Sequence, residues 1–350
     1  MTVLKVVAAT AALSLVAATT AAAGSTGGTA TATPTIADTT LSPWSDYLAR
    51  AAAASYWGGP ITAKTGEMVT IYLSETYPED PALAQKWADY IASLVHGSEI
   101  SSVSVYLAPL GEVQGVCGFR ALACYSPFRD ALYVPGEPPS PEVSAESIVA
   151  HEYGHHVAAN RVNTPWPAVE YGTKRWASHI NVCARTAVGE LHPGAERSSE
   201  YALNPGEGFA ETYRLMNERK AGLAETPWRV VSDALYPDEA AVALAEQDVT
   251  TPWQGPTTST RTGSLSKRTR VRWYTIPTPL DGTLGVTMGV PRSGRFTVAL
   301  FTPAGARVAS ETAAGRAVSV TTEICGQRSF RVRVSRVKGA AAFRLTVSTP

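Results

Sequence analysis

Two histidines and a glutamate stand close together in the middle of the chain, in the stretch His151-Glu152-Tyr153-Gly154-His155. On a helix, side chains four residues apart lie on one face, so His151 and His155 can share one tetrahedral Zn²⁺. Glu152 points to the edge of that face, where it can reach a water on the metal without binding the metal itself. This spacing predicts a zinc site with Glu152 as the general base.

The residues around this stretch predict the helix that it needs. Ser140, followed by Pro141, is the expected N-cap, with Ser144 as a later alternative, and Asn160 is the expected end. Gly154 interrupts an otherwise good helical sequence. A glycine at such a position indicates that something packs closely against the helix.

A zinc site of this type needs a third protein ligand and an open fourth position. Arg161 stands ten residues after His151, where a histidine would mark a metzincin, and this excludes that class. The best candidate ligand is Glu207, which shares one helical face with Glu211 in a helix that Asn204 caps. Two carboxylates so placed repel each other unless a cation lies opposite them. We expect Glu207 to bind zinc and Glu211 to accept the N–H of a zinc-bound histidine.

Other interpretations of these residues stay open. Glu170, His179 and His192 are further candidate ligands. Glu207 also fits a capping box at the third position of its helix, and Glu211 also fits a solvent-exposed helix face. The plain alternative for the histidine motif is a buried helix that carries two histidines and a glutamate by chance.

The two motifs together resemble those of the lethal-factor-like zinc peptidases, within the gluzincins. The resemblance is carried by HEYGHH and by a downstream N-P-x-E-x-F-A-E-x-Y-R-L-M pattern, and it covers about residues 145–217. It implies a zincin-like fold and peptide hydrolysis with Glu152 as the base. The zinc ligands that it implies are His151, His155 and Glu207.

In that family a tyrosine shortly before the third ligand stabilises the oxyanion. Tyr201, six residues before Glu207, is the matching residue here, and a packing aromatic is the alternative. Gly208 departs from the family, in which an aromatic residue is more usual, and we expect it to loosen the packing beside Glu207. In many zinc peptidases the strand before the motif helix pairs with an extended substrate. We assign this role to residues 132–134, with an ordinary core strand as the alternative.

Composition indicates a folded protein made of two different units. Of its 350 residues, 45% are hydrophobic and 17% are charged, which is enough for a sizeable core. From Arg261 to the end there are 15 lysines and arginines but only 3 acidic residues, so this part carries a net charge of +12 and the remainder −12. Such an asymmetry indicates units with different surfaces.

We predict an α+β zincin-like catalytic domain followed by an all-β sandwich. The start of the chain has a lysine, an apolar run and small residues before a cleavage point, as in a signal peptide. Short alternating strands separated by turns are typical of an antiparallel sandwich, and they occupy the last part. The expected boundaries are a signal peptide at 1–23, a flexible linker at 24–42, the catalytic domain at 43–249, a linker at 250–262 and the sandwich at 263–350.

Export makes the four cysteines candidates for disulfide bonds. Cys117 and Cys124 lie close together among turn residues, so we expect them to pair. That leaves Cys183 and Cys325 as the second pair, with two unpaired buried thiols as the alternative. A zinc-binding cysteine pair is not expected, because the sequence contains no C-x-x-C.

These features together predict a secreted, extracellular zinc endopeptidase with a peptide or protein substrate. A catalytically silent zincin-fold adhesion module is one alternative, and a zinc amidase that cuts cell-wall cross-links is another. The basic sandwich makes an anionic cell-wall polymer a further candidate partner. We expect no nucleic-acid partner, since the chain has no recognition motif, and no stretch long enough to span a membrane.

Overall fold

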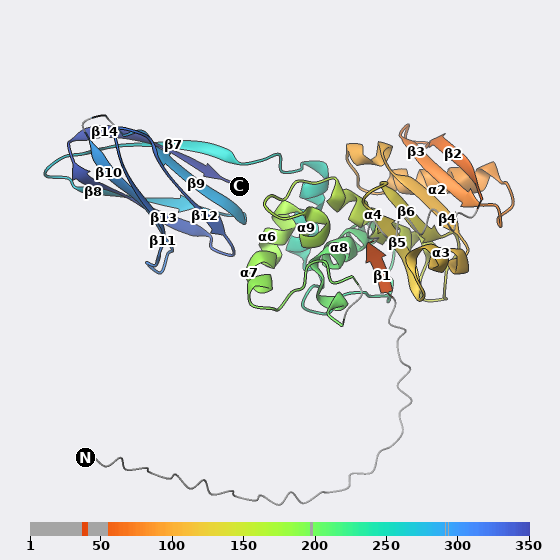
Figure 1. The fold of residues 1–350 in the computed structure, drawn as a ribbon. Coiled ribbons are helices and arrows are strands. Elements are labelled where there is room, and N and C mark those ends of the chain that lie inside the picture. Colours follow the sequence, from red (N-terminus) through yellow and green to blue (C-terminus); the bar gives the residue numbers. More distant parts are fainter. Residues whose placement is uncertain (1–36, 41–54, 197–198, 291, 293) are drawn as a thin grey trace, which may run out of the picture. The chain divides into compact units, whose positions relative to one another are not determined.

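The computed structural model describes residues 37–40, 55–196, 199–290, 292 and 294–350 (Figure 1). The predicted signal peptide, 1–23, lies outside these residues, as does most of the predicted linker, 24–42. The described part of that linker, Ala37–Thr40, forms strand β1 instead. A sheet edge offers unpaired backbone groups, so a segment without apolar bulk can still pair there.

Helices and one mixed sheet make up the described chain as far as Thr250. The sheet has six strands in the order β1-β5-β6-β4-β3-β2. The neighbours β3, β4 and β6 run parallel, whereas β5 is antiparallel to β6 and β2 is antiparallel to β3. The strand bounds are β1 Ala37–Thr40, β2 Tyr56–Thr62, β3 Met68–Ser74, β4 Ser104–Ala108, β5 Ala121–Ser126 and β6 Ala131–Pro135.

Strand β6 lies inside the sheet, so the expected cleft strand at residues 132–134 is wrong. Leu132 pairs with Tyr125 of β5 on one side and with Val105 of β4 on the other. Both edges of β6 are therefore used, and a substrate strand cannot join it. The neighbour that fills its edge, β5, is buried at every position and has no period-2 alternation to reveal it in the sequence.

Helices α2 and α4 contact one face of the sheet, at strands β3, β5 and β6. Leu132 and Val134 belong to the core that these helices share, whereas Ala131 and Tyr133 belong to a second cluster, because alternate residues of a strand face opposite sides. Helix α3 packs on that second side. The helix bounds are α2 Pro81–Ser93, η1 Ser98–Ser101, α3 Leu110–Cys117, α4 Ala145–Ala159, α5 Ala168–Tyr171, α6 Lys174–Ile180, α7 Val182–Ala187, η2 Tyr201–Leu203, α8 Pro205–Lys220 and α9 Glu239–Thr250.

The histidine motif lies on α4, which starts later than its first expected cap. Ser144 is the N-cap, and its hydroxyl accepts a hydrogen bond from the Ser147 N–H at 3.0 Å. Ser140 pairs instead with Val143 in an isolated β-bridge, so the chain is not yet helical there. The helix ends at Asn160, as predicted.

Helix α8 crosses α4 in close contact at Gly154. A methyl group at Gly154 would lie 2.8 Å from the Ala210 Cα, so only a glycine allows this approach. Tyr153 of α4 and Tyr213 of α8 pack nearby, with ring centroids 5.9 Å apart. The close neighbour that the sequence predicted for Gly154 is therefore α8, the helix that carries the second motif.

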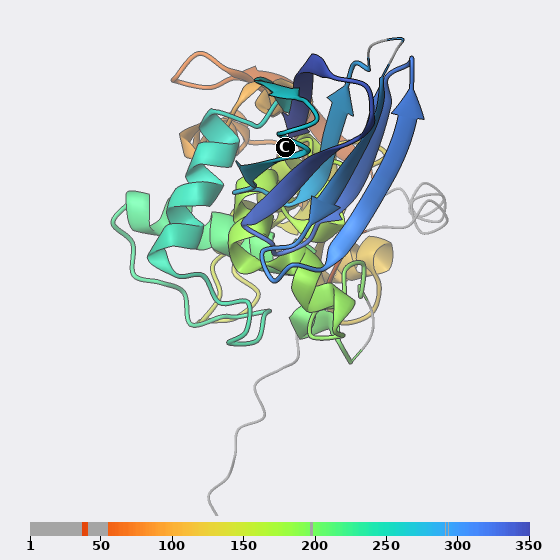
Figure 2. The ribbon, with the colours of Figure 1, turned by 90° about the vertical axis from the view of Figure 1, so that its left-hand side faces the viewer.

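From Thr257 onward the described chain forms only strands, cyan to dark blue in Figure 2. They make two four-stranded antiparallel sheets, β11-β10-β13-β8 and β12-β9-β14-β7, around one shared hydrophobic core. Strand β7 begins inside the predicted linker 250–262, and β11 is largely exposed and lacks clear alternation. The bounds are β7 Thr257–Leu265, β8 Val271–Pro277, β9 Gly282–Met288, β10 Arg295–Phe301, β11 Arg307–Ala314, β12 Val318–Ile324, β13 Ser329–Lys338 and β14 Ala341–Thr349.

Both disulfide bonds are present with the predicted pairing. Cys117 joins Cys124 between the end of α3 and β5. Cys183 of α7 joins Cys325, which follows β12, across a separation of 142 residues. Within the described ranges, no helix combines the length and the apolar character that crossing a membrane requires.

Replacing Gly154 by alanine tests the contact between α4 and α8. The new methyl group would press on the Ala210 backbone, and overpacking of this kind costs about 1–3 kcal/mol of unfolding free energy. Denaturant unfolding followed by circular dichroism measures the change. Gly115→Ala in α3 is the matched control, because a methyl group there meets nothing within 4 Å. The control should be neutral or stabilising, and equal losses in both variants would contradict the contact.

Candidate metal centre

Three buried side chains from α4 and α8 meet at one point. The ligand atoms of His151, His155 and Glu207 all lie within 4.8 Å of one another. Glu207 Oε2 is 3.2 Å from His151 Nε2 and 3.4 Å from His155 Nε2. Two imidazole nitrogens and one carboxylate oxygen are a donor set that divalent transition metals prefer. The group could therefore hold a metal ion.

Glu207 faces the histidines and does not cap its own helix. Asn204 is the cap, since its side-chain oxygen accepts the Gly206 N–H at 3.0 Å. Burial raises the pKa of the Glu207 carboxyl, but the charges and hydrogen bonds of His155 and His151 outweigh burial and hold this pKa well below its usual range. The carboxyl group is therefore ionised, which is the form that binds metal ions.

Glu152 and Tyr201 lie beside this group without belonging to it. Glu152 follows His151 on α4 and is completely buried. Tyr201, in the short helix η2, donates its hydroxyl hydrogen to Glu207 Oε2 at 2.9 Å. The same oxygen is the one nearest to both histidines. The structure thus brings the Tyr201 hydroxyl group to the candidate metal centre, and it buries Glu152 next to the ligand candidate His151 on α4.

Glu211 lies on the far side of His151 from Glu207. Its Oε2 atom is 3.5 Å from His151 Nδ1, and its side chain is fully buried, so it does not belong to a solvated face. A proton on Nδ1 facing Glu211 leaves the lone pair on Nε2, the nitrogen that faces Glu207. Burial raises the pKa of Glu211, but the hydrogen bonds from His151 and Arg214 outweigh burial. The pKa of Glu211 is therefore lowered from its usual value.

Arg214 is the cation that compensates the buried carboxylates. Its Nε and Nη2 atoms donate to the two oxygens of Glu211 at 3.0 and 2.7 Å, and its Nη1 atom donates to Glu218 at 2.7 Å. Burial lowers the pKa of Arg214, but these hydrogen bonds and charges raise it far above its usual value. Bidentate pairing of this kind fixes the position of the carboxylate as well as its charge.

Glu218 continues this network to other parts of the chain. It accepts hydrogen bonds from Ser147 of α4 at 2.7 Å and from Thr226 at 3.0 Å. The backbone oxygen of Trp228 accepts from Arg214 at 3.2 Å, and the Trp228 ring lies 5.5 Å from the ring of His151. These partners belong to α4 and to the segment that follows α8.

Sequence reasoning missed this network, although part of it has a local signal. Glu211, Arg214 and Glu218 are spaced by three and four residues on one helix, which is the spacing of ion pairs on a helix face. That signal could have identified Arg214. Ser147 and Trp228 have no such signal, because only the folding of the chain brings them to the site.

The other candidate ligands lie elsewhere. His179 pairs with Asp238 at 3.1 Å. Within the described residues, neither Glu170, His179 nor His192 forms a metal-ligating group with the two motif histidines. The third histidine of the HEYGHH stretch, His156, is also buried, and its Nε2 atom lies 2.9 Å from the backbone oxygen of Glu99.

Gly208 does not loosen the packing beside Glu207, contrary to our expectation. A methyl group at Gly208 would lie 3.2 Å from the Trp176 ring and 3.3 Å from a methyl group of Leu235. These two side chains reach in from α6 and from the segment before α9. They fill the volume that an aromatic side chain at this position would need, so the wall beside Glu207 is tightly packed.

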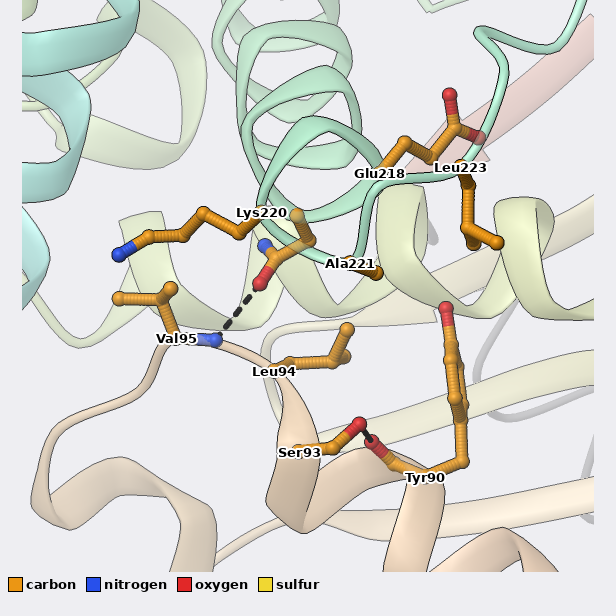
Figure 3. Close-up of a pocket in the computed structure, with 9 residues that line it drawn as sticks. Tyr90, Ser93, Leu94, Val95, Glu218, Lys220, Ala221 and Leu223 are labelled. Atoms are coloured by element: carbon orange, nitrogen blue, oxygen red, sulfur yellow. Dashed lines mark hydrogen bonds between the residues drawn. The ribbon is translucent and has the colours of Figure 1, made fainter.

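A surface pocket of about 360 Å³ lies where the end of α2 meets the end of α8 (Figure 3). Val95 and Asn217 both line this pocket, and the Val95 N–H donates to the Asn217 side chain at 2.7 Å. Among the predicted and observed site residues, only Glu218 lines it. The pocket therefore adjoins the outer end of the Arg214 network and contains none of the candidate metal ligands.

No protein-family model and no curated protein matches the chain. Among solved structures, the pre-peptidase C-terminal domain of a collagenase from Bacillus anthracis is 16% identical over 26% of this chain and 88% of that chain, with a TM-score of 0.23. The Yersinia pseudotuberculosis-derived mitogen is 11% identical over 27% of this chain and 87% of that chain, also with a TM-score of 0.23. The SPBc2 prophage-derived protein YomS is 12% identical over 27% of this chain and 96% of that chain, with a TM-score of 0.21.

Removing the charge of Arg214 tests the buried network. Arg214→Met leaves Glu211 and Glu218 as buried carboxylates without their cation, and loss of one partner of a buried pair costs about 3–5 kcal/mol. Arg219→Met is the matched control, because Arg219, the next arginine on α8, pairs with Glu225 at 2.7 Å on the surface. An exposed pair contributes about 1 kcal/mol or less. Similar unfolding free energies for the two variants would show that the network does not stabilise the fold.

Proposed function

We propose that this protein is a secreted, zinc-dependent endopeptidase with a zincin-like catalytic domain at residues 43–249. The observation that carries the proposal is the buried group of His151, His155 and Glu207, with Glu152 next to it on α4. Three protein ligands of this kind are typical of catalytic zinc sites, which keep a fourth position open. The resemblance of the two motifs to those of lethal-factor-like peptidases also supports a zinc-dependent endopeptidase.

His151, His155 and Glu207 would hold the ion through two imidazole nitrogens and a carboxylate. A bound Zn²⁺ supplies Lewis-acid chemistry, since it polarises a substrate carbonyl and makes water easier to deprotonate. Glu211 keeps His151 in the form that has its lone pair on Nε2, and Arg214 keeps Glu211 in place through two hydrogen bonds. These contacts orient the ligand before any substrate binds.

Glu152 acts as the general base of the proposed reaction. Its carboxylate takes a proton from the attacking water as the water oxygen forms a bond with the scissile carbon. The same proton then passes to the amine nitrogen as the carbon–nitrogen bond breaks. Its place in the chain supports this role, because it follows the ligand His151 on α4 without being part of the ligand group.

Tyr201 stabilises the negative charge that develops on the carbonyl oxygen. Its hydroxyl group lies 2.9 Å from Glu207 Oε2, so a donor is already in place beside the metal centre. A donor held at the position where charge develops lowers the barrier without further reorganisation. The two disulfide bonds support an extracellular location for the reaction, because such bonds persist in oxidising compartments.

Incubation of the purified full-length protein with a peptide library tests the proposed activity directly. We expect cleavage that a chelator abolishes and that added Zn²⁺ restores, with products identified by mass spectrometry. Metal-loaded protein that cleaves cell-wall cross-links but no peptide would replace the proposal by an amidase. Metal-loaded protein that hydrolyses neither substrate would indicate an adhesion module.

The Glu152→Gln variant separates catalysis from metal binding. It should bind as much zinc as the wild type, whereas its peptide cleavage should fall by about 10²–10⁴-fold, because the amide cannot accept the proton. Zinc content by mass spectrometry and initial cleavage rates are the measurements. Glu146→Gln on the same helix is the control, since Glu146 pairs with Lys86 near the surface at 2.8 Å. Normal turnover in Glu152→Gln would exclude this residue as the base.

Three glutamine variants identify the third ligand. Glu207→Gln should weaken zinc binding by orders of magnitude, because the charged donor is lost. Glu211→Gln should weaken it by about 10–100-fold, as for other residues that orient a ligand. Glu170→Gln is the control and should retain zinc fully. Zinc retained after dialysis against a weak chelator is measured for each, and retention by Glu207→Gln with loss in Glu170→Gln would show that Glu170 is the ligand.

A further inference from the structure

The outer face of the sheet β11-β10-β13-β8 carries a cluster of two aromatic rings and two arginines. In β13, Phe330, Val332 and Val334 fill the core, so the alternate residues Arg331 and Arg333 point outward. The register pairs Arg333 with Trp273 of β8, and it pairs Arg331 with Phe301 of β10. The four side chains therefore come from three adjacent strands.

These four side chains form one continuous surface, which we call the Trp273 platform. The rings of Trp273 and Phe301 meet above the strand between them, with centroids 5.2 Å apart. The Arg331 guanidinium lies 4.5 Å from the centroid of the Trp273 ring, and the Arg333 guanidinium lies 5.0 Å from that of Phe301. Contacts between cations and ring faces of this kind are attractive, so they help to keep the two arginines beside the rings.

Exposure of the indole distinguishes this platform from a packed sheet face. Trp273 is 43% exposed, more than any other tryptophan in the described ranges. The core of the sandwich is complete without it, since the inward residues of the same strands fill that core. A large exposed aromatic surface that is not needed for folding indicates a binding site.

The charge of the platform is not compensated by its own surroundings. Within the described part of the chain, neither Arg331 nor Arg333 forms an ion pair, whereas Arg328, before them on the chain, pairs with Asp281 at 2.8 Å. The cross-strand neighbours of the two arginines on this face are neutral: Thr275, Ala299, Trp273 and Phe301. The platform therefore presents two positive charges and fits an anionic partner.

We propose that the Trp273 platform binds an anionic polysaccharide. The apolar face of a sugar ring packs on the exposed indole, and the two guanidinium groups bind carboxylate, sulfate or phosphate groups along the polymer in a bidentate manner. Thr275 and Ser335 border the platform on β8 and β13 and offer hydroxyl groups to the sugar hydroxyls. A flat sheet face accommodates an extended chain, and this binding is separate from the proposed peptidase reaction.

Binding of defined polymers to the purified full-length protein tests the proposal. The probes are polygalacturonate, dextran sulfate and uncharged dextran, and isothermal titration gives the dissociation constants at two salt concentrations. We expect the two anionic polymers to bind and dextran not to bind. Trp273→Ala should weaken binding by about tenfold or more, and Arg331→Gln combined with Arg333→Gln should weaken it similarly and reduce its dependence on salt.

Arg344→Gln is the matched control, because Arg344 is an exposed arginine on the outer face of the other sheet, in β14. It should change the dissociation constant by less than about twofold. Equal weakening in this control would mean that the overall positive charge, and not the platform, attracts the polymer. The arginine double variant keeps the indole, so it gives a result even if Trp273→Ala does not fold.

Three results would overturn the proposal. The first is that neither anionic polymer binds in a saturable way. The second is that dextran binds as tightly as dextran sulfate. The third is that the variants of the platform bind the anionic polymers like the wild type. Phosphatidylserine vesicles serve as a fourth probe. Vesicle binding that depends on Trp273, without binding of the polymers, would reassign the platform to a membrane surface.

Discussion

The close approach of α4 and α8 at Gly154 is the constraint on which the candidate metal centre depends. A side chain at this position would meet the Ala210 backbone, so the distance between the two helices is set by the absence of a Cβ atom. At this distance the carboxylate of Glu207 reaches both motif histidines, and Glu211 reaches the opposite nitrogen of His151. One contact between helix backbones thus determines the geometry of four polar side chains.

Close packing of this kind concentrates charge in the protein interior, where the buried cation Arg214 compensates part of it. Glu207, Glu211 and Glu218 are all buried on α8, and Arg214 pairs with Glu211 and Glu218 through its three nitrogen atoms. The third, Glu207, faces the histidines, where a metal ion would complete the balance. Buried ions are stable only when each is paired and hydrogen-bonded, so the same arrangement that supports the fold also orients the site.

Local spacing explains why the group of His151, His155 and Glu207 could be predicted from the sequence. Each helix fixes its own pair of side chains, and the pairing of Cys183 with Cys325 followed once the two nearby cysteines were paired. The failures concern contacts that no local pattern encodes. Strand β5 is buried on both faces and shows no alternation, so the position of residues 132–134 inside the sheet was unpredictable. The partners of Glu218 are likewise brought together only by the folded chain.

The bond between Cys183 and Cys325 turns much of the protein into a covalent ring. The two cysteines are 142 positions apart. The chain between them includes α8 with its carboxylates, the segment that connects the helices to the strands, and most of the sandwich. A single break of the backbone anywhere in this ring opens it without releasing either part. The protein would thus keep its C-terminal strands attached to the helices after such a cut, and only a cut combined with reduction of the disulfide bond would separate them.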